Sequence, residues 1–146
     1  MIDEDDFQRA LDANPSNAAI RGVFADWLFE QGDERWLGMR WLFLTGKRPT
    51  DDRYEAREGR PWGWYWGLVF DGRQNCACID EIEHHNDIKF TDPIAIGNCW
   101  AWPTRQEAET SLCNLFAALS AETRDRLLAE AEAEHEKREG VTSWAG

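Results

Sequence analysis

The chain has few basic residues and no long apolar run, and these two absences exclude two classes of partner. Among its 146 residues, 16 are Lys or Arg and 28 are Asp or Glu, which gives a formal net charge of −12. Nucleic acids and anionic membranes are bound through clustered Lys and Arg. The longest apolar stretches, near residues 41–44 and 64–70, are far shorter than the roughly 20 residues that cross a bilayer. We therefore expect neither nucleic acid nor membrane as a partner.

Cysteine is also scarce, and the common catalytic motifs are missing. Four cysteines in 146 residues do not make a disulfide scaffold. The N-terminal MIDEDDF is acidic where a secretory leader is basic and then apolar, so a cytoplasmic protein is expected. We find no Gly-rich phosphate loop, nucleophile elbow, His-Glu-x-x-His helix or paired-carboxylate motif. No cofactor is expected, and an enzyme is not favoured.

The first 46 residues predict three short helices. An acidic start at residues 3–6 suits the N-terminus of the first helix, and Asn14-Pro15 should end it. Ser16 or Asn17 can cap the second helix, which runs to about residue 31. The third helix should begin after Asp33 and end at Thr45-Gly46.

The second helix carries an apolar stripe that contains one acidic residue. The stripe consists of Ile20, Val23, Phe24, Trp27 and Leu28, at intervals of three and four residues. Asp26 lies among them, and a buried carboxylate is costly unless it is paired. Asp26 is thus either a site residue with a raised pKa or a structural residue paired with an arginine such as Arg40.

The middle of the chain changes from helical to strand-like patterns. Residues 47–61 are polar and predict a connector with room for one helical turn. From residue 62 to 70 the period becomes two residues, which predicts a β-strand. Asp71-Gly72 predicts a turn into a return strand at 76–79, and residues 94–102 predict a third strand with a bulge or bend at 97–98.

The last third predicts two helices. Thr104 and Glu107 form a capping box, and an apolar stripe follows that comprises Ala108, Leu112, Leu115, Phe116 and Leu119. Ser120 can cap the second of these helices, whose inner face is Leu127, Leu128 and Ala131. Because EHEKREG after Ala133 has no apolar face, we expect this helix to fray before Gly140.

These elements predict an α+β fold. A helical module (1–46) and a connector (47–61) precede an α+β portion (62–139), which packs on the module as one compact unit, and residues 140–146 form a tail. In this arrangement a small, mainly antiparallel sheet lies beside the three-helix module and is covered by the two C-terminal helices.

Nine tryptophans supply the main candidates for a binding surface. If their faces meet solvent, they form an aromatic platform for a sugar, a peptide or the apolar patch of a protein; if they meet the C-terminal helices, they form core. The candidates for partner binding are Trp36, Trp41, Trp62, Trp64 and Trp66.

A cysteine and histidine set is the nearest approach to a metal site. Its members are Cys76, Cys78, His84, His85 and Cys99. Zinc takes four such ligands in tetrahedral geometry, usually with a Cys-x₂-Cys turn, whereas this chain has Cys-x-Cys and no second pair nearby. Buried thiols and surface imidazoles are the alternative interpretation, and we assign no metal ligand.

The run FADWLFEQGD, residues 24–33, carries a resemblance to a known family. Together with the preceding LDANPSNAAIRGV and the following ERWLGMRWL, it resembles the repeat-companion domain of bacterial proteins. The matching residues are Phe24, Ala25, Asp26, Trp27, Leu28, Glu30, Gly32 and Asp33, and the resemblance covers residues 3–46. It implies a helical accessory or interaction module and brings no biochemical activity with it.

Three functions follow from these observations. The favoured one is a non-enzymatic bacterial module that binds another protein. The alternative is an acidic protein of the immunity or antitoxin kind, whose charge of −12 would neutralise a basic partner. The third is a hydrolase that depends on Cys/His chemistry or on zinc.

Overall fold

We examined a computed structural model of the whole chain. It describes the backbone of residues 2–54, 63–69, 94–96, 99–102 and 104–140, and the side chains of residues 2–49 and 104–140. Five helices occur within these residues: α1 (Glu4–Ala13), α2 (Ala18–Glu30), α3 (Trp36–Thr45), α5 (Arg105–Ala118) and α6 (Ala121–Glu139). Four strands occur: β1 (Thr50–Tyr54), β2 (Gly63–Val69), β3 (Ile94–Ile96) and β4 (Cys99–Trp102).

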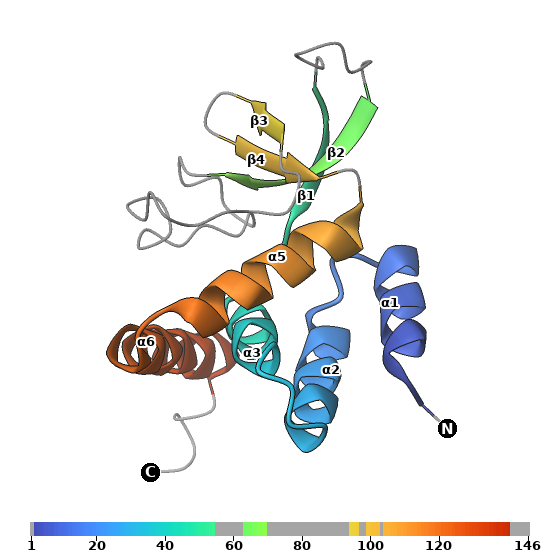
Figure 1. Cartoon of the computed structure of the whole chain (residues 1–146). Coiled ribbons are helices and arrows are strands. Elements are labelled where there is room, and N and C mark those ends of the chain that lie inside the picture. The colour runs from blue at the N-terminus through green and yellow to red at the C-terminus, as the bar shows by residue number, and fades with distance from the viewer. Residues whose placement is uncertain (1, 55–62, 70–93, 97–98, 103, 141–146) are drawn as a thin grey trace.

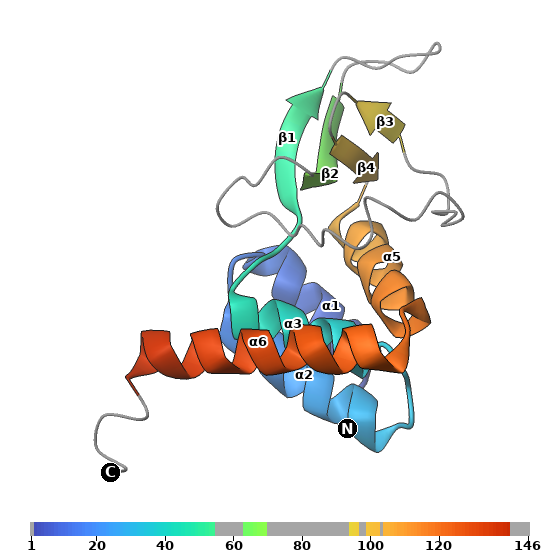
Figure 2. The same ribbon diagram turned by 90° about the vertical axis from the view of Figure 1, so that its left-hand side faces the viewer.

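The helices pack around α3. On one side α3 contacts α2 and α5, and on another it contacts α6, while α1 packs against α2. Figure 1 shows α5 running diagonally across the body, with α1 and α2 beside each other below its N-terminal half. In the turned view of Figure 2, α6 lies across α3. The N-terminal and C-terminal helices therefore build one helical body.

Short polar side chains start these helices at the expected places. Asp3 accepts a hydrogen bond from the Asp6 amide, Asn17 from the Ile20 amide and Ser120 from the Thr123 amide. These bonds satisfy backbone donors that have no partner within a helix. The predicted starts of the first, second and last helices are thus confirmed, as is the hydrogen bond from the Glu107 amide to Thr104 at the start of α5.

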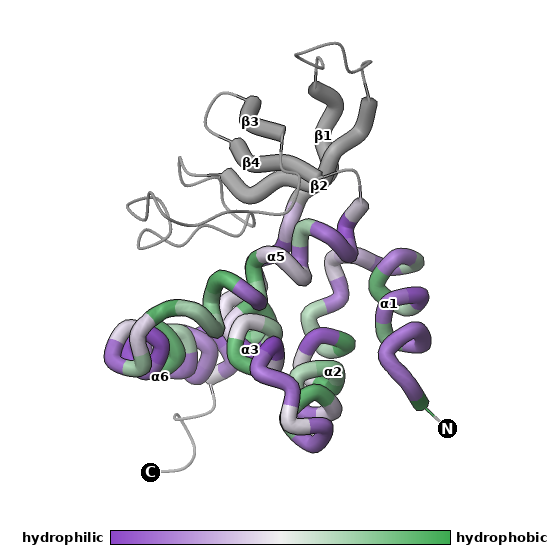
Figure 3. The backbone as a smooth tube through the Cα atoms, viewed as in Figure 1, coloured by the Kyte–Doolittle hydropathy of each residue, from purple (hydrophilic) through white to green (hydrophobic). Residues whose placement is uncertain are grey.

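The core lies where α1, α2, α3 and α5 meet. It includes Phe24, Leu28, Leu42, Leu112 and Phe116, none of which is more than 1% exposed. Hydrophobic and hydrophilic residues are interspersed along the outer helices in Figure 3, whereas α3 carries a single charged residue, Arg40, and is contacted by α2, α5 and α6. The predicted inner faces of α5 and α6 are confirmed, because the whole α5 stripe and Ala131 are buried.

A glycine brings α3 and α5 unusually close. A Cβ atom at Gly38 would lie 2.8 Å from the Cα atom of Cys113, so no other residue fits there without moving a helix. The contact explains why α3 packs directly on α5 rather than on a sheet. Close packing of this kind transmits any change in volume to both helices.

The predicted α+β fold is wrong for the body of the protein. Where side chains are described, at residues 2–49 and 104–140, the chain is 78% helical with five helices and no strand, and it is all-α. The backbone of the four strands forms a sheet of order β1-β2-β4-β3 with antiparallel pairs, beyond α5 in Figures 1 and 2. Both C-terminal helices pack on α3, and α5 also contacts β2 and β4, so the two helices do not together form a layer that covers the sheet.

Other details also differ from expectation. Residues 94–102 do not form one strand: β3 and β4 pair with each other, Ile96 opposite Cys99. Within the predicted connector, residues 50–54 form β1, and residues 55–61 lie outside the described residues. The last helix does not fray at Ala133 but continues to Glu139, where Arg138 donates a hydrogen bond to the Leu44 carbonyl. The predicted return strand at 76–79 lies outside the described residues.

Candidate functional site

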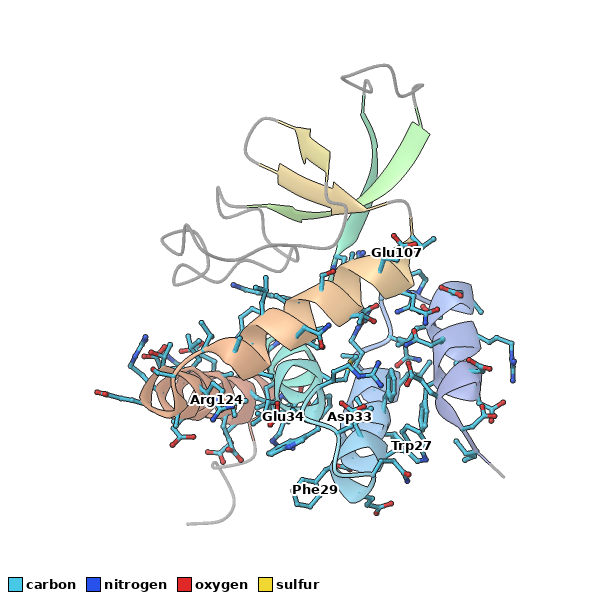
Figure 4. All side chains as sticks on the ribbon, in the orientation of Figure 1. Trp27, Phe29, Asp33, Glu34, Glu107 and Arg124 are labelled. Atoms are coloured by element: carbon cyan, nitrogen blue, oxygen red, sulfur yellow. The ribbon has the colours of Figure 1, made fainter. Side chains whose placement is uncertain are left out.

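Two aromatic side chains meet at the α2–α3 turn, and an exposed valine lies nearer the middle of α2. Phe29 is 60% exposed, and its ring meets the half-buried ring of Trp36 edge to face at a centroid distance of 5.0 Å. Val23, on the outer side of α2, is 58% exposed. Figure 4 shows Phe29 projecting from the end of α2, away from the body. We call Val23, Phe29 and Trp36 the aromatic edge.

Acidic residues accompany the aromatic edge. Asp26 lies three residues from both Val23 and Phe29, so it shares their side of the helix, and Glu30 follows directly. Glu34 lies in the turn just before Trp36. All three carboxylates are exposed. The surface therefore combines apolar rings with negative charge.

The turn between α2 and α3 fixes the position of the two rings. Gly32 has a φ of +71°, a left-handed conformation that glycine adopts without strain, and the Asp33 amide donates to the Leu28 carbonyl at 3.0 Å. Asp33 then accepts a hydrogen bond from the Arg35 amide at 3.0 Å. The predicted glycine stop is confirmed, whereas α3 begins at Trp36 with Arg35 as its N-cap and has no side-chain cap bond. Asp33 instead holds the turn that brings Phe29 and Trp36 together.

Arg35 ties this turn to α1. Its guanidinium donates to both carboxylate oxygens of Glu4, at 2.6 and 3.0 Å, and to Asp33 at 2.8 Å. Hydrogen bonds to Arg35 lower the pKa of Glu4 and the pKa of Asp33 below their ordinary values. The hydrogen bonds that Arg35 donates to Glu4, and then those that it donates to Asp33, raise the pKa of Arg35. This cation is neutralised locally and leaves the acidic character of the edge intact.

A second charged cluster is buried where α1, α2 and α5 meet. Glu109 accepts a hydrogen bond from Arg21 at 2.6 Å and another from Arg105. Arg105 also donates to the side chain of Gln8 at 2.6 Å and to Asp12 at 3.0 Å. Arg21, Arg105 and Glu109 are at most 2% exposed. We call Arg21, Arg105, Glu109 and Gln8 the buried charge cluster.

The buried charge cluster has the character of a structural element. Almost all of its hydrogen-bonding capacity is used within the protein, which is how buried charges are tolerated. One atom, Nη2 of Arg21, is buried without a hydrogen-bond partner. The two open hollows found among the described residues, of about 590 and 710 Å³, are not lined by any member of this cluster. Within the part of the chain that the structure describes, neither of these hollows reaches the cluster.

The described residues offer no catalytic centre. No group of three His, Cys, Asp or Glu side chains among them could hold a metal ion. Cys113 is buried, and burial followed by the nearby Glu109 charge raises the pKa of its thiol, so it is not a ready nucleophile. The two hollows are lined by the 31–35 turn, Asp12 and polar residues of α5, without histidine or cysteine.

The predicted site residues have different positions. Trp36 belongs to the aromatic edge, whereas Trp41 is only 4% exposed and packs in the core beside Phe116. Trp62 lies outside the described residues, and only the backbone is described at Trp64 and Trp66. The Cys and His set considered as a metal site also lies outside the described residues, except for the backbone of Cys99.

Two features of α2 escaped sequence reasoning. Val23 was expected in the apolar stripe but is exposed, and Asp26 is exposed rather than buried among apolar residues. The buried face consists of Arg21, Phe24, Ala25 and Leu28, so it is rotated relative to the predicted stripe. The seven-residue interval between Arg21 and Leu28 was the available signal, but a charged residue is rarely counted as core.

Comparisons of the chain with family models, with curated proteins and with solved structures found no match. Within the described residues, no helix is both long and apolar enough to cross a membrane.

Proposed function

We propose that this chain is a non-enzymatic module that binds another protein through the aromatic edge. The observation that carries the proposal is Phe29, a large apolar ring that is 60% exposed yet held in place against Trp36. Exposed aromatic residues with a fixed position are typical anchors of protein interfaces, because they bury much area at a small entropic cost.

The acidic residues beside the edge define the chemistry of the partner. Asp26, Glu30 and Glu34 would attract Lys and Arg, and the net charge of −12 would speed the approach of a basic protein. The same charges would oppose pairing of this surface with a second copy of the chain. We therefore propose as partner a segment that carries both basic and apolar side chains, such as a basic amphipathic helix.

The proposal extends to family and location. The FADWLFEQGD run of α2 and its turn resembles the repeat-companion domain, and an accessory binding module agrees with what that resemblance implies. A cytoplasmic location is part of the proposal and is compatible with the free thiol of Cys113.

A binding assay with matched variants tests the proposal. The probe is a fluorescent peptide that forms a helix with Leu on one face and Lys on the other, and its anisotropy is titrated with the protein. Phe29→Ser should weaken binding about tenfold or more. The control is Ile2→Ser, because Ile2 is a comparably exposed apolar residue, at 62%, remote from the edge in sequence. A peptide with Glu in place of Lys should not bind.

Photo-crosslinking in cells then identifies the natural partner. A photoreactive phenylalanine analogue at position 29 should capture a basic protein that the same analogue at position 2 does not. Equal effects of the two serine variants, or equal binding of the Lys and Glu peptides, would overturn the proposal. Binding that falls steeply with salt but ignores Phe29→Ser would instead favour the acidic immunity-like alternative.

A further inference from the structure

Helix α6 is the longest helix among the described residues and the least buried. Of its 19 residues only Ala131 is buried, and Leu127 and Leu128 are half-buried. By contrast, α5 buries seven of its 14 residues. Little apolar area therefore holds α6 to the body.

Besides these residues, the ring of Phe43 in α3 contacts the ring of His135 in α6 at a centroid distance of 5.1 Å, and polar contacts also attach α6. Near the start of the helix, Arg124 donates to the Ala117 carbonyl at 2.9 Å, and near its end Arg138 donates to the Leu44 carbonyl. Between them Arg40 pairs with Glu132 at 3.5 Å, with both side chains at least 35% exposed. Exposed ion pairs of this kind contribute little to stability.

The helix is built to persist without its neighbours. It starts at a Ser120 cap and ends at Gly140, which has a φ of +67°. Lys137 and Arg138 lie in its last turn, where the helix dipole favours positive charge. Arg126 and Glu130 form an i,i+4 pair. Its 19 residues, rich in Ala, Glu, Arg and Leu, exceed the length at which isolated helices become marginal.

We propose that α6 is a releasable strap. It detaches from α3 and stays helical, while the body formed by α1, α2, α3 and α5 stays folded. Arg40 faces α6 through its pair with Glu132, and Leu37 and Leu44 lie three and four residues from Arg40 on the same side of α3. Release of α6 would uncover this apolar side of α3.

Hydrogen exchange of the full chain tests the strap directly. Amides of α6 should exchange at least about tenfold faster than those of α5. Because release of α6 exposes less surface than global unfolding does, low denaturant should speed α6 exchange with a smaller slope than it speeds α5 exchange. Equal protection of the two helices, rising and falling together with denaturant, would overturn the proposal.

A pair of neighbouring variants sharpens this test. Arg138→Ala removes the bond to the Leu44 carbonyl and should speed α6 exchange by about threefold or more, without changing α5. Lys137→Ala is the matched control, because it removes an equal charge from the same exposed last turn. It should change α6 exchange less than about twofold. Parallel acceleration of α5 by Arg138→Ala would contradict the strap, because α6 would then unfold with the core.

Discussion

The two C-terminal helices pack on the same helix, α3, by opposite means. Helix α5 fits against α3 so tightly that a Cβ atom at Gly38 would collide with its backbone, and it carries the carboxylate of the buried charge cluster. Helix α6 buries one residue and depends on bonds at its two ends. Tertiary packing thus stabilises α5, whereas α6 owes more to its own propensity, capping and length.

This difference separates what must stay fixed from what can move. The buried charge cluster joins α1, α2 and α5, so the aromatic edge stands on a framework whose parts constrain one another. A helix held by few buried contacts opens at a lower free energy than the core does. We therefore expect substitutions in α5 to lower the free energy of unfolding more than substitutions in α6 do, and to affect more of the helices.

The largest effect is expected from Glu109→Gln. The change leaves Arg21 and Arg105 buried with too little negative charge, and it should lower the free energy of unfolding by about 3–5 kcal/mol. Urea denaturation followed by circular dichroism measures the loss. Glu107→Gln is the control, since Glu107 is exposed on the same helix and should cost about 0.5 kcal/mol or less.

A triple variant separates charge from packing in the buried charge cluster. Arg21→Met, Arg105→Met and Glu109→Leu together remove all three charges, and they should recover most of the stability lost in Glu109→Gln. Failure to recover it, or a loss below about 1 kcal/mol for Glu109→Gln, would mean that Glu109 does not hold the helices together as described.

A smaller effect is expected from equal truncations on the two helices. Leu112→Ala in α5 removes a side chain that is 1% exposed and should cost about 2–4 kcal/mol. Leu128→Ala in α6 removes a half-buried one and should cost about 1 kcal/mol or less. Thermal and urea unfolding measure both. Similar losses for the two variants would mean that α6 is as much a part of the core as α5.

Local sequence signals predicted the helices better than the way they pack. Asn17, Gly32, Gly46 and Ser120 act within a few residues of themselves, so the sequence reveals the helix ends they set. The contact of Gly38 with Cys113 joins residues 75 positions apart, and a glycine inside an apolar helix does not say which helix it will meet. For the same reason the pairing of α5 and α6 with α3, rather than with strands, was not foreseen.

The candidate site was only partly accessible to sequence reasoning. Trp36 was chosen because it is aromatic, and Trp41 was chosen on the same ground but is core. Phe29 was missed because the candidates were chosen among the tryptophans, and the predicted apolar stripe also had the wrong rotation about the helix axis. Burial of Arg21 against Glu109 sets that rotation, and no spacing rule applied to apolar residues includes an arginine.

The smallest effect expected is a pH dependence that arises at Arg35, on the α1 and α2 side of the comparison. Because Arg35 lowers the pKa of Glu4 and of Asp33 in the folded protein, their contribution is complete above the unfolded pKa values of about 4. This contribution to the free energy of unfolding is lost as the pH falls through the lowered pKa values of the folded protein. Between about pH 5 and about pH 2.5, the range set by those pKa values, the free energy of unfolding should therefore fall less steeply in Arg35→Met than in the original chain.

Arg9→Met is the control for this pH profile. Arg9 also pairs with an acid, Asp6, but the pKa of Asp6 is lowered mainly by the Asp3 amide, which the substitution leaves in place. The Arg9 variant should keep the slope of the original chain. Hydrogen exchange at acidic pH adds the spatial test: acid should loosen α1 and the α2–α3 turn, whereas α6, which has no contact with Arg35 among the described interactions, should keep its exchange relative to the intrinsic rate. If acid speeds exchange in α6 as much as in α1, the two sides of α3 unfold together. The difference between α5 and α6 would then lie only in how much area each helix buries.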